Sequence, residues 1–144
     1  HDLAVRFSRC CNPVPGDEIV GFVTRGRGVS IHRTDCINVI NLPEDERGRL
    51  IDAEWQVAEN PTSTEQYSTE IQIFANNRIG LFADISKVFT EKQIDITSMN
   101  VRTSKQGRAT IIMTFDIHGT EELNRITDKI RQIDGVLDIQ RTTG

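Results

Sequence analysis

The sequence has no apolar run that approaches the roughly 20 residues needed to cross a bilayer, so a membrane span is not expected. It has no basic leader followed by an apolar stretch and a cleavage site, which are typical of secreted proteins. It has only three cysteines, and an odd number with two of them adjacent does not make an ordinary disulfide framework. Because reduced thiols fit the cytosol, we expect a cytoplasmic protein with no membrane partner.

Motifs that signal catalysis are also missing. The sequence has no glycine–lysine loop for phosphate, no nucleophile motif and no HExxH metal helix. Gly26 and Gly28 do not form a dinucleotide fingerprint, because Ile31 stands where a third glycine belongs and a strand follows. We therefore predict that no catalytic residue lies in this segment.

Charge is distributed unevenly along the chain. The net charge of −4 opposes strong non-specific binding of nucleic acid by the chain as a whole. Residues 1–36, however, hold five arginines against four acids, whereas residues 37–68 hold two arginines against seven acids. The acidity therefore lies in the middle of the chain, and the first part is the one suited to contact phosphates.

A polar, proline-containing stretch without apolar periodicity separates two parts of the chain. We predict a module at residues 1–57, a linker at 58–67 and a second domain at 68–144. In the first module, the residue pattern predicts strands at 3–7, 18–24, 29–33 and 50–57. A short helix at 36–40, capped by Thr34 or Asp35, and a solvated acidic loop at 43–49 complete this small, β-rich module.

The second domain alternates between strand and helix periodicity. The predicted elements are a strand around Ile71, a helix at 80–92, strands at 94–102 and 108–117, a second helix and a strand at 136–141. The second helix takes Thr120 as its N-cap and has Leu123, Ile126, Ile130 and Ile133 on one face. The order β-α-β-β-α-β predicts a ferredoxin-like α+β fold with both helices on one face of an antiparallel sheet.

Four soft or borderline ligands, Cys10, Cys11, His32 and Cys36, occur in the first module. Tetrahedral zinc accepts such a set of three cysteines and one histidine. Both adjacent thiols reach one ion only if the chain turns at Cys10 and Cys11, because neighbours on a regular strand point to opposite faces. The alternative is that the cysteines are small core residues. The sequence leaves a structural zinc ion and plain packing both open.

Arginines gather around the glycines of the first module. Arg25, Arg27 and Arg33, together with Arg9, could hold phosphates, while the glycines between them would let a ligand approach the backbone. The alternative is an exposed hairpin whose arginines only increase solubility. An RNA contact is therefore one of two interpretations of this charge.

The first module resembles the cysteine-containing module in the C-terminal half of the long RelA/SpoT-type stringent-response proteins, at residues 9–17 (RCCNPVPGD) and 21–36 (GFVTRGRGVSIHRTDC). In that family the module docks on ribosomal RNA when the protein senses an uncharged tRNA. The resemblance implies a parent that is a bifunctional GTP diphosphokinase and guanosine-bis(diphosphate) 3′-diphosphohydrolase. Its active sites would lie upstream of residue 1.

The second domain resembles the ACT family at residues 77–85 (NRIGLFADI) and 96–102 (ITSMNVR). The resemblance implies an amino-acid effector held between the loop after the first strand and a neighbouring protomer, and so a homodimer. The implied ligand-binding residues are Asn77, Arg78, Ile79, Gly80 and Leu81 on the loop, with Ile96, Ser98 and Asn100 as the opposing wall. The usual Asp-Arg-Pro-Gly wording is Asn-Arg-Ile-Gly here, and nearby apolar residues favour a branched-chain amino acid.

Together these patterns predict a regulatory segment. It would contact the ribosome through the first module and sense an amino acid through the second, and so control a catalytic half outside this chain. The alternative is a purely structural dimerisation module that has no ligand.

Overall fold

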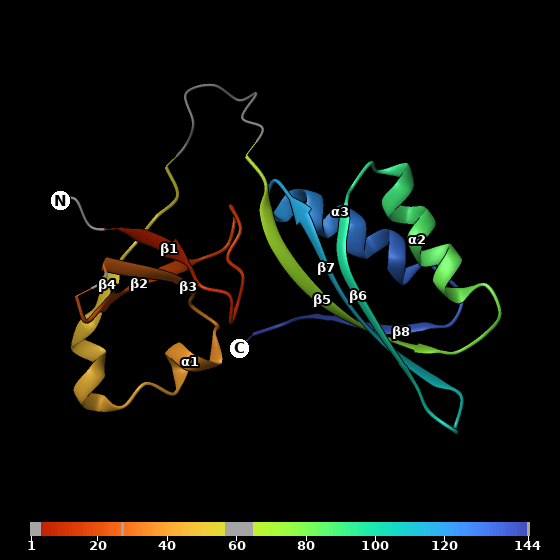
Figure 1. Cartoon of the computed structure of the whole chain (residues 1–144), viewed down its shortest axis with the longest axis horizontal. Helices are drawn as coiled ribbons and strands as arrows, with labels where there is room; N and C mark the ends of the chain where they lie inside the picture. The colour runs from red at the N-terminus through yellow and green to blue at the C-terminus, as the bar shows by residue number, and fades with distance from the viewer. Residues whose placement is uncertain (1–3, 27, 57–64, 144) are drawn as a thin grey trace. The chain divides into compact units, whose positions relative to one another are not determined.

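The computed structural model describes residues 4–26, 28–56 and 65–143 (Figure 1). The chain forms two compact units, one made of residues 1–65 with 142–144 and the other of residues 66–141. The predicted linker at 58–67 lies mostly outside the described residues. Among the described residues, no helix is both long and apolar enough to cross a bilayer.

The first unit contains a four-stranded sheet with the order β1-β3-β2-β4. Its strands are β1 (Val5–Phe7), β2 (Ile19–Thr24), β3 (Gly28–Arg33) and β4 (Leu50–Asp52). β2 pairs antiparallel with β3, which confirms the predicted hairpin, and β1 pairs in parallel with β3. The hairpin turn is possible because Gly26 and Gly28 adopt φ angles of 73° and 102°.

Three details of the first unit differ from prediction. The helix α1 (Ile37–Ile40) is capped by Cys36, whose backbone is extended, and not by Thr34 or Asp35. The segment predicted as an acidic loop forms a 3-10 helix, η1 (Glu44–Arg49), because three acids in its first turn and two arginines in its last turn complement the helix dipole. β4 ends at Asp52, since it pairs with only three residues of β2.

The hydrophobic core of the first unit is small. Only six of its described residues are apolar and buried, against sixteen in the second unit. Two of the six are Cys11 and Cys36. These two cysteines pack with Val39, and Cys10, Val20 and Leu50 lie against them. Small units with so little core often have another source of stability, such as disulfides or a metal ion.

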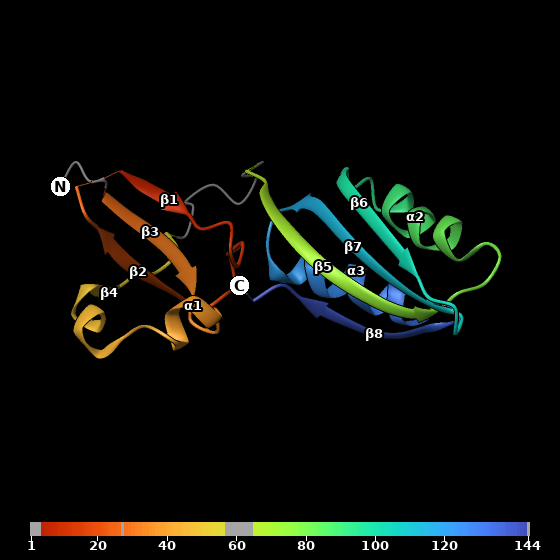
Figure 2. The same cartoon turned by 60° about the horizontal axis from the view of Figure 1, so that its bottom comes forward.

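The second unit has the predicted β-α-β-β-α-β order. Its elements are β5 (Tyr67–Asn76), α2 (Leu81–Glu91), β6 (Ile96–Thr103), β7 (Arg108–Ile117), α3 (Thr120–Arg131) and β8 (Val136–Arg141). The four strands are antiparallel in the order β6-β7-β5-β8, and Figures 1 and 2 show both helices on the same face of the sheet. The α+β, ferredoxin-like fold is confirmed.

Packing in the second unit follows the strand periodicity. Alternate residues of β5 and β7, including Ile71, Ile73, Ile111 and Met113, are fully buried. Phe89 of α2 meets Phe115 of β7 edge to face, with ring centroids 4.9 Å apart. The sheet and the helices therefore enclose one apolar layer.

The beginning and end of α3 differ slightly from prediction. Its N-cap is Gly119, and Thr120 is the first helical residue. The carboxylate of Glu122 accepts a hydrogen bond from the backbone N–H of His118 at 2.8 Å. This bond fixes the backbone just before the helix, so the N-cap lies one residue earlier than predicted. Ile133 lies beyond the end of the helix.

Candidate metal centre and ligand loop

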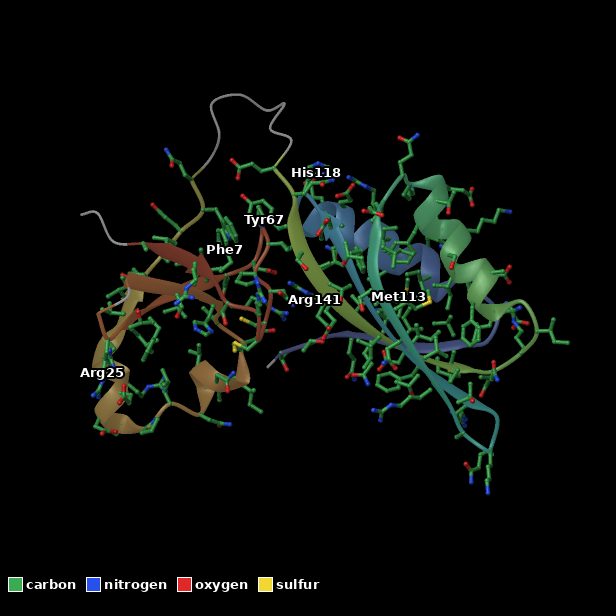
Figure 3. The ribbon with its side chains drawn as sticks, in the orientation of Figure 1. Phe7, Arg25, Tyr67, Met113, His118 and Arg141 are labelled. Carbon is green, nitrogen blue, oxygen red and sulfur yellow. The ribbon has the colours of Figure 1, made fainter. Side chains whose placement is uncertain are left out.

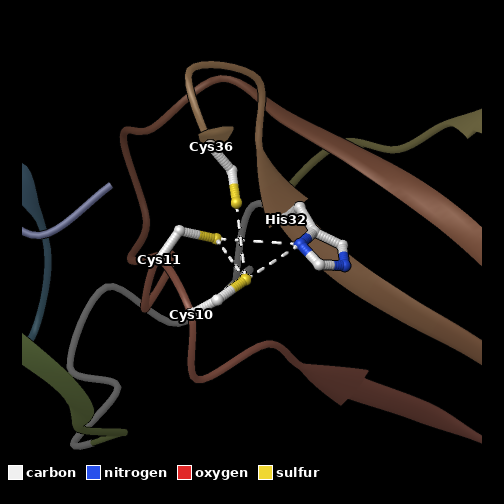
Figure 4. Close-up of side chains that lie close together, drawn as sticks. All are labelled: Cys10, Cys11, His32 and Cys36. Atoms are coloured by element: carbon white, nitrogen blue, oxygen red, sulfur yellow. Dashed lines mark hydrogen bonds between the residues drawn. The ribbon is translucent and has the colours of Figure 1, made fainter. Parts of the chain in front are cut away.

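Cys10, Cys11, His32 and Cys36 converge at one point in the first unit (Figure 4). Their four ligand atoms all lie within 4.8 Å of one another. The Sγ atom of Cys10 lies 3.4 Å from His32 Nδ1, 3.4 Å from Cys36 Sγ and 4.0 Å from Cys11 Sγ. Cys10 and Cys11 lie in the loop after β1, His32 lies on β3, and Cys36 caps α1. The fold itself therefore assembles the cluster.

A turn after β1 explains how two adjacent cysteines reach the same point. The backbone N–H of Asn12 donates to the carbonyl of Ser8 at 3.0 Å, and Asn12 adopts a positive φ of 49°. The chain therefore reverses at Cys10 and Cys11 and is not extended there. This turn removes the obstacle that a regular strand would present to joint coordination.

Neighbouring polar groups orient the four side chains. The hydroxyl of Ser8 lies 2.8 Å from Cys10 Sγ, and the hydroxyl of Ser30 lies 3.0 Å from His32 Nε2. The backbone N–H of Arg33 donates to Cys11 Sγ at 3.3 Å. A partner on the second ring nitrogen is a usual feature of a metal-binding histidine, because it fixes the tautomer and the ring plane. The sequence pattern gave no signal for Ser8 or Ser30.

The protonation of the metal-free cluster follows from burial. Burial raises the pKa of the Cys11 thiol to about 12 and also raises the pKa of Cys36. Burial opposes ionisation of Cys10 too, but hydrogen bonds from Ser8, Asn38 and the other cysteines outweigh it and lower its pKa. Burial lowers the pKa of His32, which favours the neutral ring that binds metals.

The donor set and its spacing fit a zinc ion. A regular tetrahedron with Zn–S bonds of about 2.3 Å has edges of about 3.8 Å. Four of the six separations between the ligand atoms range from 3.4 to 4.0 Å, and all six are within 4.8 Å. Three cysteines and one histidine form a closed structural site, and bound zinc would hold the thiols as thiolates. Its role here would be to join the loop after β1, β3 and α1.

The arginines predicted to bind RNA lie in different environments. Arg25, which is labelled in Figure 3, lies at the end of the hairpin. Its side chain is 83% exposed and lies 3.6 Å from Glu46, and Arg9 is also exposed. Arg33 is buried: its guanidinium donates to the carbonyl of Cys11 at 3.3 Å and pairs with Asp35. Arg27 lies outside the described residues. Arg9 and Arg25 are therefore exposed to solvent, whereas Arg33 braces the cysteine loop.

The predicted ligand loop of the second unit is fixed by Arg78. Its guanidinium donates to the carbonyl of Asp134 at 2.9 Å, to the carbonyl of Ile79 at 3.0 Å and to the carboxylate of Asp84 at 2.8 Å. Gly80 caps α2 in the left-handed region, with φ of 84°. The remaining predicted loop residues differ in exposure: Asn77 and Ile79 are exposed, and Leu81 is fully buried in the core.

The predicted opposing wall is divided between two faces of β6. Ile96 pairs with the buried Phe115, whereas Ser98 and Asn100 pair with residues of β7 that alternate with the buried ones. A register shift between Ile96 and Ser98 causes this division. Through β7, Ser98 aligns with Glu70, six positions before the end of β5 at Asn76, a separation of roughly 20 Å along the strand. The loop and this wall therefore do not meet within one protomer.

Comparison with known proteins identifies both units. Residues 1–56 match the RelA/SpoT RIS domain family, and residues 63–141 match the ACT domain family. A GTP pyrophosphokinase of Streptomyces coelicolor is 39% identical over 142 residues, which are 99% of this chain and 16% of that protein. A bifunctional (p)ppGpp synthase/hydrolase RelA of Mycobacterium tuberculosis is 37% identical over 141 residues, which are 98% of this chain and 18% of that protein.

Among solved structures, the ACT domain from the GTP pyrophosphokinase of Chlorobium tepidum is similar with a TM-score of 0.49 and 22% identity, over 54% of this chain and 99% of that one. The chain spans less than a fifth of the length of the two curated relatives. The family matches agree with the order of the two units, a cysteine-bearing unit followed by a β-α-β-β-α-β unit. The chain therefore belongs to the RelA/SpoT RIS domain and ACT domain families, with the cysteine–histidine cluster in the RIS domain and the antiparallel sheet in the ACT domain.

Proposed function

We propose that this chain is the regulatory segment of a stringent-response GTP pyrophosphokinase and (p)ppGpp hydrolase, whose catalytic half lies outside it. The observation that carries this proposal is the order of a RIS domain and an ACT domain over nearly the whole chain, shared with proteins named for that activity. Zinc binding, the ribosome contact and amino-acid sensing are the separate parts of the proposal, and each has its own support.

The RIS domain is the part proposed to bind zinc and ribosomal RNA. The cluster of four donors within 4.8 Å and the small apolar core both favour a structural ion. Exposed Arg25 and Arg9 supply charge for phosphates, and in the full-length parent the partner would be the ribosome with its tRNA. Arg33 is not part of this surface, since its guanidinium is buried against Cys11 and Asp35.

Replacement of Arg25 tests the RNA contact. An Arg25→Ala variant of the full-length parent should bind ribosomes more weakly, and the slope of log affinity against log salt should fall by about one. Arg125, which is exposed on α3 of the ACT domain, provides the control, and Arg125→Ala should leave both values unchanged. An unchanged slope for Arg25→Ala would remove the hairpin from the contact.

The ACT domain is the part proposed to bind a branched-chain amino acid and to form a homodimer. Hydrogen bonds from Arg78 hold the loop at 77–81 in place. The neighbouring Ile79 is fully exposed, so its apolar side chain is accessible to a ligand or to a second copy of the chain. Because the loop and the wall at Ser98 lie at different ends of one sheet, a site built from both needs two protomers. A ligand that prefers one dimer arrangement would shift the population toward it, typically by 1–3 kcal/mol.

Calorimetric titration of the chain with valine, leucine and isoleucine tests this second part. We expect heat of binding at millimolar ligand, and we expect this heat to be lost in an Ile79→Asp variant. No heat with any of the three would leave the alternative, a structural dimerisation module without a ligand. Sedimentation of the same samples determines whether the dimer exists.

A further inference from the structure

A cavity of about 170 Å³ lies in the RIS domain beside the metal centre. It is lined by Phe22 of β2, by His32 of β3, and by Asn38, Val39 and Leu42 in and just after α1. The ring of His32 borders both sites, since its Nδ1 faces the cysteines while the residue also lines the cavity. The donor cluster and the cavity therefore have His32 in common.

The size and lining of the cavity suit one flat ring. An apolar protein cavity of about 150 Å³ accepts a benzene molecule, so the volume here is sufficient for a six-membered aromatic ring. Phe22 offers an aromatic surface, and Val39 and Leu42 offer apolar contacts. The side chain of Asn38 also contacts Cys10, and the remaining donor and acceptor of its amide can pair with the polar edge of a heterocycle. A purely aliphatic ligand could not hydrogen-bond to that amide.

Two guanidinium groups lie beside the lining residues. The Cζ atom of Arg49 sits 5.1 Å from the centroid of the Phe22 ring, and Nη1 of Arg47 donates to the carbonyl of Val39 at 3.2 Å. Glu46 contacts Arg49 at 3.2 Å, but this pair is partly exposed and contributes little to stability. Phosphate oxygens can replace the carboxylate at such an arginine, so the surroundings suit a ring that carries phosphates on either side.

We propose that this cavity accepts one unpaired base of an RNA, with Arg47 and Arg49 holding the adjacent phosphates. The inference rests on the proposed RNA contact of the RIS domain and gives that contact a base-binding site. RNA loops and single strands expose bases that stack on aromatic side chains, whereas bases in a duplex are not available. An aromatic side chain from a protein partner would also fill the cavity, but it would not use the two arginines.

Filling the cavity tests the proposal. The probes are a fluorescent single-stranded RNA of mixed sequence and a perfect RNA duplex, each titrated with the zinc-loaded 144-residue chain and followed by anisotropy. Leu42→Trp places a ring in the cavity, and the matched control Ile40→Trp adds the same ring at a position that is 60% exposed on α1. Loss of one stacked base predicts about tenfold weaker binding of single strands by Leu42→Trp and little change for Ile40→Trp or for the duplex.

The outcomes separate this inference from the proposed function. If the wild-type chain binds single-stranded RNA and Leu42→Trp binds it equally well, the base site is wrong and the RNA contact stands. If the wild-type chain binds no RNA, both fail. If Leu42→Trp instead weakens self-association, the cavity accepts a protein side chain, which also overturns the inference.

A second pair of variants covers the case in which Leu42→Trp does not fold. Asn38→Ala removes the amide from the cavity, and Asn41→Ala removes the same group three positions away, at a residue that does not line it. Only Asn38→Ala should weaken single-strand binding, by about three- to tenfold. Because Asn38 also contacts Cys10, the zinc content of each variant is measured alongside, and equal binding by both variants at full zinc content would overturn the proposal.

Discussion

The Sγ atom of Cys10 lies 3.4 Å from that of Cys36, although the two residues are 26 positions apart. Cys10 follows β1 and Cys36 caps α1, so this approach brings together the two ends of the RIS domain's β1–α1 segment. Four donors with this spacing could hold one metal ion, and the small apolar core of the domain supports the proposal of a structural zinc site.

Removal of the ion should destabilise the RIS domain. Addition of a zinc chelator to the wild-type chain is expected to lower the urea midpoint of unfolding, measured by fluorescence of Trp55, the only tryptophan. In Cys36→Ser the midpoint should already be low, and the chelator should have no further effect, because one ligand is missing. Equal chelator sensitivity of both proteins would show that Cys36 is not a ligand.

The two glycines of the hairpin should differ in their tolerance to alanine. A Cβ atom at Gly28 would overlap the carbonyl oxygen of Ala4, whose position is set by a hydrogen bond from Val29 at 2.8 Å, whereas Gly26 has nothing within 4 Å. Both have positive φ. Gly26→Ala should cost roughly 1 kcal/mol and Gly28→Ala roughly 3 kcal/mol in urea unfolding. The fluorescence of Trp55 should report this unfolding, because its ring stacks on Phe7 of β1 with ring centroids 5.4 Å apart. Equal losses would contradict the close approach.

Loss of Arg78 should loosen the loop at 77–81 of the ACT domain, which is the predicted ligand loop. Two of its three hydrogen bonds join that loop to Asp84 on α2 and to Asp134 before β8, and the third is made to Ile79 within the loop. Because Arg78 is partly exposed, Arg78→Ala should lower the unfolding free energy by only about 1 kcal/mol. Hydrogen exchange of the amides at 77–81 should become clearly faster, with Arg125→Ala as the control. Unchanged exchange would mean that the loop is held by its backbone alone.

The sequence was most informative where a pattern repeats locally. In the ACT domain, the alternation of β7 and the helical spacing of α2 allowed their bounds to be predicted to within a residue. The hairpin of the RIS domain was also predictable from local sequence, since Gly26 and Gly28 permit its turn. Errors gathered at element ends and in the charged segment now seen as η1, where capping and dipole effects decide the structure.

The sites were less predictable because they depend on contacts between distant residues. The cysteine–histidine set could be proposed from residue type, but the turn at Asn12 that brings Cys10 and Cys11 together left no clear signal. Arg33 looked like part of a basic tip, yet it is buried because its guanidinium holds the carbonyl of Cys11. Arg47 and Arg49, placed in an acidic loop by composition, lie beside the cavity through contacts with Val39 and Phe22.

The most direct test of the central claim is the zinc content of the chain purified without oxygen and without added metal. Elemental analysis should find close to one zinc ion per wild-type chain, and clearly less in His32→Ala, because the loss of one of four proposed ligands weakens a closed site. His118→Ala should keep the wild-type content, since His118 lies on the ACT domain and contacts Glu122. Wild-type protein that is folded, reduced and free of zinc would contradict the claim that Cys10, Cys11, His32 and Cys36 form a structural metal centre.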